Sequence, residues 1–131
     1  MIQLSNNKFD LEERTAKFAE EVIDFVKIIK INAVNQRIIN QLVGSAGSVG
    51  ANYCEATEGE SKKDFVHKIG ICKKEIKETQ FWLRLLARSD SEEKEKIRIF
   101  RSYALLMCIW LILAKNEKLT KIQFSLTLAI F

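Results

Sequence analysis

The stretch G-S-A-G-S-V-G-A-N, residues 44–52, holds three of the five glycines in this 131-residue chain. A phosphate-binding loop would follow a strand and carry G-x-G-x-x-G or G-K-[ST]. A strained turn presenting a nucleophilic serine would carry G-x-S-x-G, but Ser48 lies in A-G-S-V-G. Because residues 38–43 show a helical pattern, the stretch is predicted to lie in mid-helix. Its small side chains would then let a neighbouring backbone approach closely. Each glycine lowers helix stability by about 1 kcal/mol relative to alanine, and this cost suggests that the glycines serve tight packing.

Amphipathic helices are predicted on both sides of this stretch, because apolar residues recur at alternating steps of three and four. The four segments with this pattern are residues 9–30, 35–58, 62–88 and 92–115. Asp10 and Ser61 are the expected N-caps of the first and third segments. The chain contains no proline, which favours long, uninterrupted helices. Short connections between the helices predict an all-α, antiparallel up-down four-helix bundle that forms one domain, residues 1–131.

The buried face of each helix is expected to follow its apolar seam. In the second helix this seam consists of Ile38, Leu42, Ser45, Val49, Asn52 and Ala56. Ser45 and Asn52 are polar, so both are expected to have hydrogen-bond partners. In the third helix the seam consists of Phe65, Ile69, Cys72, Ile76, Thr79, Leu83 and Leu86.

The fourth helix is apolar on more than one side. Two separate apolar seams run along it, and a helix that is apolar all round is normally buried all round. Since a bundle helix has an outer face, we expect a second chain to cover it, giving a homo-oligomer. The expected interface residues are Tyr103, Leu106, Ile109, Trp110 and Leu113. The apolar run at 103–114 is shorter than the roughly 20 residues that span a bilayer, so no membrane contact is predicted.

The last eleven residues, 121–131, change to a period of two, because apolar side chains alternate with polar or small ones. This period is typical of a strand. Three arrangements remain open for this extended tail. It pairs with residues 1–4, pairs with a neighbouring subunit, or lies irregularly over apolar surface.

The sequence does not contain a recognisable catalytic or metal-binding set of residues. Cys54, Cys72 and Cys108 are far apart and odd in number, which favours buried thiols in a reducing cytoplasm over disulfides or a zinc site. A carboxylate di-metal centre in a bundle needs two Glu-x-x-His pairs, and His67 is the sole histidine. The N-terminal segment lacks the apolar region of a secretory signal. We therefore expect a cytoplasmic protein that is not an enzyme and uses no cofactor and no metal.

Positive charge is concentrated in the second half of the chain. The net charge is +4 overall. Residues 62–101 carry twelve Lys and Arg against seven Asp and Glu, whereas residues 1–33 carry five against six. At 100° per residue, one face of the third helix gathers Lys63, Lys73, Lys74, Lys77, Arg84 and Arg88, with Phe81 among them. Neutralisation of phosphates and base stacking require this combination. The alternative is a solvated face with an ordinary Lys74–Glu78 pair.

Four segments of the chain resemble the four-helix-bundle proteins encoded in intervening sequences of bacterial 23S rRNA genes. These segments are F-D-L-E-E-R-T-A-K-F-A (9–19), N-Q-L-V-G-S-A-G-S-V-G-A-N-Y-C-E-A (40–56), S-K-K-D-F (61–65) and K-K-E-I-K-E-T-Q-F-W-L-R-L-L (73–86). The resemblance covers about residues 8–115. It implies a cytoplasmic, non-enzymatic homopentamer. The family is similar in fold to the accessory variability protein of diversity-generating retroelements, which binds nucleic acid and a reverse transcriptase.

Two functions are consistent with these patterns. The first is an oligomeric protein that binds RNA or DNA through the basic face of the third helix. The second is a protein-interaction scaffold, or an accessory subunit of a nucleic-acid enzyme such as a reverse transcriptase, in which the basic face is incidental.

Overall fold

The computed structural model describes residues 10–90 and 92–114, and these residues form four helices. The helices are α1 (Leu11–Lys27), α2 (Asn35–Thr57), α3 (Lys62–Ser89) and α4 (Lys94–Ala114). Helix α1 is shorter than predicted at its C-terminal end. There the backbone N–H groups of Ile28 and Ile29 donate to the carbonyls of Phe25 and Val26, three residues back instead of the four of an α-helix. The predicted tail at 121–131 lies outside the described residues.

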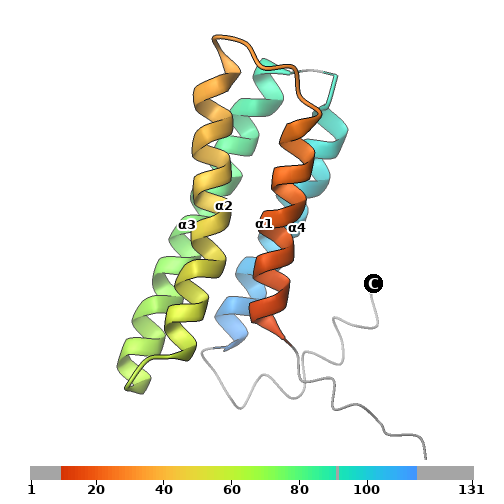
Figure 1. Cartoon of the computed structure of the whole chain (residues 1–131). Helices are drawn as coiled ribbons and strands as arrows, with labels where there is room; N and C mark the ends of the chain where they lie inside the picture. Colours follow the sequence, from red (N-terminus) through yellow and green to blue (C-terminus); the bar gives the residue numbers. More distant parts are fainter. Residues whose placement is uncertain (1–9, 91, 115–131) are drawn as a thin grey trace, which may run out of the picture.

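The helices stand side by side in an antiparallel bundle, and each connection is short (Figure 1). Helix α2 packs extensively against α3 and also against α1, while α3 packs against α4. The contact between α1 and α4 is slighter. Helices α1 and α3 are therefore diagonal neighbours with outer faces on opposite sides of the molecule. The predicted all-α four-helix bundle is confirmed.

Both predicted N-caps form. The Asp10 carboxylate accepts a hydrogen bond from the backbone N–H of Glu13 at 3.1 Å. At the start of α3, the Ser61 hydroxyl accepts from the N–H of Asp64 at 3.1 Å, and donates to the Asp64 carboxylate at 2.6 Å. Each cap satisfies a backbone donor that the first helical turn leaves without a partner, so these residues fix where α1 and α3 begin.

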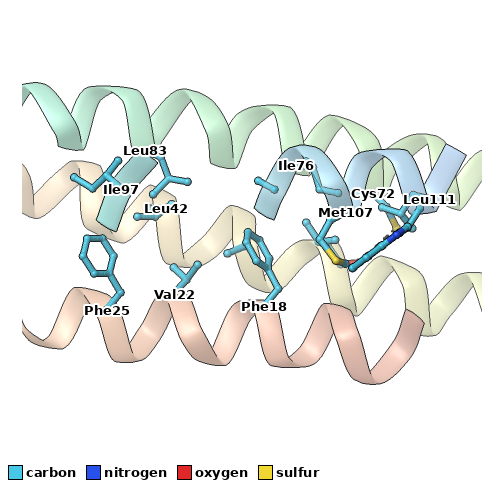
Figure 2. Packing of buried hydrophobic residues seen from close by; sticks show 14 of the residues in the cluster. Phe18, Val22, Phe25, Leu42, Cys72, Ile76, Leu83, Ile97, Met107 and Leu111 are labelled. Atoms are coloured by element: carbon cyan, nitrogen blue, oxygen red, sulfur yellow. Dashed lines mark hydrogen bonds between the residues drawn. The ribbon is translucent and has the colours of Figure 1, made fainter. Parts of the chain in front are cut away.

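The core lies where the apolar seams of the four helices meet (Figure 2). Phe18 and Phe25 of α1 reach across to α4, where their rings lie 5.3 Å from Tyr103 and 5.0 Å from Phe100. The buried seam of α1, with steps of four and three residues, consists of Leu11, Thr15, Phe18, Val22 and Phe25, and it continues at Ile29 beyond the helix end. The seam predicted for the third helix is buried except at Phe65, which is half-buried.

The seam of α2 differs in part from the prediction. Ile39 is buried, whereas the predicted Ile38 and Asn52 are only half-buried. The reason is that α2 contacts both α1 and α3, so its buried arc is wider than one stripe. Ser45 is buried and accepts a hydrogen bond from the Thr79 hydroxyl of α3 at 3.0 Å, and the Asn52 amide donates to the Ser48 carbonyl at 2.8 Å. The expected partners of both polar side chains are thus present.

Residues 44–52 lie in the middle of α2, as predicted. Of the three glycines, only Gly50 faces another helix. An added Cβ there would stand 3.5 Å from Thr15 Oγ1 and 3.6 Å from the backbone nitrogen of Ala16. At Gly44 and Gly47 an added Cβ would meet nothing within 4 Å. Close helix packing within the chain therefore accounts for one glycine and leaves two exposed.

Candidate nucleic-acid interface

The outer face of α3 is basic, with one cation near its start and the others between Lys73 and Arg88. Helix α3 carries eight Lys or Arg against three Asp or Glu. Five of the six predicted cations are exposed and Lys73 is half-buried, and none forms an ion pair with a described residue. From Lys63 to Arg88 the stripe extends over 25 residues, or about 38 Å at 1.5 Å per residue.

The carboxylates of α3 stay away from this stripe. Asp64 is engaged at the N-cap. Glu78 accepts a hydrogen bond from the indole N–H of Trp82 at 3.1 Å, so the Lys74–Glu78 pair that a solvated face would offer does not form. Glu75 is half-buried on the same flank, where desolvation and then the nearby Glu78 raise its pKa. The cations therefore face solvent with no carboxylate among them.

Phe81 projects from the middle of the stripe. Its side chain is 51% exposed, and its ring meets the Trp82 ring edge-on at 5.1 Å between centroids. An exposed phenylalanine is common on its own, but this ring lies between Lys77 and Arg84 on a basic surface. The structure therefore brings together all seven residues that the sequence predicted for nucleic-acid binding.

Further cations come from α4. Four basic residues and one acidic residue lie on this helix. The amide of Gln80 donates to the Arg101 carbonyl at 3.4 Å, which places Arg101 beside the stripe. A groove at the junction of α3 and α4 is lined by Lys94 and Arg98 together with the carboxylates of Glu92 and Glu95, and Arg98 forms an ion pair with Glu95. Sequence reasoning missed these residues, although the short turn at 90–93 was a usable signal because it keeps the start of α4 beside the end of α3.

The outer face of α4 differs from the predicted interface. Trp110 and Leu113 are 5% and 9% exposed, because they pack within the chain, so little of either remains for a partner. The guanidinium of Arg14 lies over the Trp110 ring at 4.7 Å. Tyr103 and Leu106 are half-buried against the core, and Ile109 is 44% exposed. The apolar residues that do face outward are Ile99, Leu105, Ile109 and Ile112.

Helix α4 also meets a length-and-composition criterion for a membrane-spanning helix. Its 21 residues include an 18-residue window with a mean hydropathy of 1.8, of which 28% is buried. Core helices of bundles meet the same criterion, and α4 contributes Ile97, Met107 and Leu111 to the core. The apolar run at 103–114 therefore understates how apolar α4 is.

The described cysteines differ sharply in environment. Cys72 is fully buried, its thiol lies 3.5 Å from the Val49 carbonyl, and burial raises its pKa to about 11. Cys54 is exposed, and its pKa is raised by partial desolvation and then by Glu12. Among residues 10–90 and 92–114, no three His, Cys, Asp or Glu side chains gather as metal ligands would.

We expect a maleimide at pH 7.5 to label Cys54 of the single, unassembled chain within minutes and to leave Cys72 unlabelled until the chain unfolds. The thiol of Cys72 is inaccessible, and its raised pKa keeps it protonated. Mass spectrometry of digested protein, with and without 6 M guanidinium chloride, gives the two rates. Equal labelling of both thiols in native protein would show that α2 and α3 separate readily.

These features define a four-helix-bundle protein with one basic helix face and an apolar outer stripe. The model of the 23S rRNA-intervening sequence protein family matches residues 7–108, and the chain belongs to this family. A similar solved structure is a protein of unknown function from the S23 ribosomal protein family of Bacteroides thetaiotaomicron VPI-5482. It is 27% identical, with a TM-score of 0.70 over 82% of this chain and 99% of that chain. No curated protein matches this chain.

Proposed function

We propose that this protein is a non-enzymatic homo-oligomer that binds RNA or DNA through the outer face of α3. The observation that carries the proposal is the basic stripe of α3, in which exposed Phe81 lies between Lys77 and Arg84. The six cations form no ion pair within the described residues, so they are available to neutralise phosphates. Neutralisation releases the counterions condensed on the nucleic acid, and this release is the main source of sequence-independent affinity. An exposed aromatic ring among them offers a stacking surface for an unpaired base.

The dimensions of the stripe suit a nucleic-acid backbone. Its length of about 38 Å is close to one turn of duplex, about 34–36 Å. A single strand could follow the same path and stack one base on Phe81. Stacking on Phe81 needs an unpaired base, so the proposal favours single-stranded or looped RNA or DNA over duplex.

Salt dependence tests the proposal. If six phosphates are neutralised, raising salt from 50 to 200 mM should weaken binding about 300-fold for a single strand and about 2,000-fold for a duplex. Fluorescence anisotropy with labelled 12-nucleotide RNA, DNA and duplex probes of mixed sequence measures these affinities. Wild-type protein that is freed of nucleic acid by nuclease and high-salt washing should be used.

Two results would overturn the proposal. One is affinity that changes less than tenfold over this salt range. The other is the absence of binding to all three probes at 50 mM salt, together with a protein that co-purifies after nuclease treatment. That second result would favour the scaffold function, in which a protein partner contacts the chain and the stripe is incidental.

A further inference from the structure

The outward side of α4 forms a ridge that residues 10–90 and 92–114 leave exposed. Its members lie four and three residues apart on one helix face, and they are Arg98, Ser102, Leu105, Ile109 and Ile112. The three apolar side chains of this α4 ridge are 54%, 44% and 42% exposed, respectively. A continuous exposed apolar strip of this kind normally marks an interaction surface.

A groove lies between α1 and α2, away from this ridge. It has a volume of about 340 Å³. Small residues dominate its lining, and the full set is Glu12, Glu13, Thr15, Ala16, Ala19, Gly47, Gly50, Ala51 and Cys54. Gly47 has nothing within 4 Å of where a Cβ would stand. The groove is therefore open and shallow-walled, and it can accept side chains from another helix.

We propose that the α4 ridge of one chain docks into the α1–α2 groove of a second copy, head to tail. Shape, position and charge support this occupant. The ridge is apolar where the groove is lined by small residues, so protruding side chains meet a depression. Because ridge and groove lie on different sides of one bundle, the α4 ridge of a chain cannot reach the groove of that same chain. The inference rests on the proposed assembly and adds which surfaces meet.

Charge supports the same pairing and disfavours ridge against ridge. Helix α1, which forms one wall of the groove, carries five carboxylates against three cations. Helix α4 carries four cations against one carboxylate, and two of these cations, Lys96 and Arg98, pair with Glu93 and Glu95. Head-to-tail contact therefore brings opposite charges together, whereas two α4 ridges would bring like charges together. Head-to-tail contacts form a ring when the rotation closes.

Contacts within the chain predict which residues meet. Arg14 contacts Trp110, so Ile109, the preceding residue, lies level with the first turn of α1 along the bundle axis. Cys54 lines the groove at that same level. The Phe18–Tyr103 contact sets Leu105 about half a helical turn nearer the start of α1 than Phe18. That is the height at which Gly50 lies against the backbone of Ala16. A closed ring has no rise between copies, so parallel bundles would place Ile109 of one copy against Cys54 of the next.

Disulfide cross-linking tests this placement in the full chain. The variant I109C/C108S retains Cys54 and lacks the half-buried neighbour Cys108. On oxidation with copper phenanthroline it should give a ladder of covalent species in steps of 15.1 kDa on a non-reducing gel. The control C54S/I109C/C108S should give none. A dimer that persists without Cys54 would show ridge-to-ridge contact and overturn the proposal.

A glycine substitution tests the groove independently. Because Gly47 has open space in the single chain, Gly47→Leu should keep the helical circular-dichroism signal of the folded bundle while filling the groove. Multi-angle light scattering should then give a single-chain mass of 15.1 kDa, against a multiple of it for wild type. The matched control is Gly70→Leu on α3, which also has nothing within 4 Å and should assemble like wild type.

Three outcomes would contradict the pairing: a monomeric wild type at 50 μM, unchanged assembly of Gly47→Leu, or wild type that floats with phosphatidylcholine liposomes as a monomer. The last would assign the α4 ridge to lipid. Failure here is distinguishable from failure of nucleic-acid binding. A Gly47→Leu monomer should still bind a 12-nucleotide probe within tenfold of the affinity of one wild-type subunit.

Discussion

The variant Lys74→Glu/Lys77→Glu/Arg84→Glu is expected to lose nucleic-acid binding by about 1,000-fold at 100 mM salt. Three of six phosphate contacts disappear, each worth close to one factor of ten near this concentration. The new carboxylates also repel the backbone. All three side chains are exposed and form no ion pair with a described residue, so the fold should persist. Anisotropy titrations against the same 12-nucleotide RNA and DNA measure the loss.

A matched control separates the basic face from net charge. Lys17→Glu/Lys30→Glu/Arg37→Glu makes the same change in charge at exposed positions on α1, α2 and their connection. It should weaken binding far less than the α3 variant. The neutral version of the α3 variant, with glutamine at the three positions, should roughly halve the salt slope. Equal losses for the two triple-glutamate variants would contradict a defined interface on α3.

Phe18→Ala is expected to lower the free energy of unfolding by about 3–5 kcal/mol. Phe18 is fully buried and packs edge-on against Tyr103, so its removal leaves a cavity at the α1–α4 contact. Domains of this size are stable by only about 5–15 kcal/mol, so the loss is a large share of the total. Urea unfolding followed by circular dichroism should be measured at one fixed protein concentration, because assembly would add to the apparent stability.

Alanine at Phe81 is the control. It should change nucleic-acid binding and leave the stability of the bundle nearly unchanged. Phe81 is 51% exposed, so Phe81→Ala should change the unfolding free energy by no more than about 0.5 kcal/mol. It should weaken single-strand binding by about 5- to 150-fold, which corresponds to 1–3 kcal/mol for one stacked base. Duplex binding should be nearly unchanged. If Phe81→Ala destabilises the bundle as much as Phe18→Ala, the ring is structural rather than a stacking surface.

The sequence predicts this fold well because three of its four helices have a clear polar side. In α1 and α3 a single apolar stripe alternates with charged residues, so the period alone identifies which positions are buried. Helix α2 is harder, because its small residues face both α1 and α3. Periodicity therefore favoured Ile38 where the structure buries Ile39.

The candidate sites divide in the same way. The basic face of α3 could be predicted because every cation on it follows from spacing within one helix. The outer stripe of α4 could not, because this helix is apolar on nearly every side and spacing does not say which stripe faces inward. Only the position of α1, whose Arg14 covers Trp110, shows that Trp110 belongs to the core. Arg101 required knowing which turns of α3 and α4 are adjacent.

The hydrogen bond between Thr79 and Ser45 has a consequence beyond the core. It fixes the angular setting of α3 about its own axis, since a slip by one residue turns a helix by 100°. Such a slip would leave the Ser45 hydroxyl without its donor and would carry Lys73 toward the apolar interior, where an ammonium group is costly. Two neutral hydroxyl groups inside the bundle therefore help to determine in which direction the cations of α3 point, and so which side of the protein attracts a polyanion.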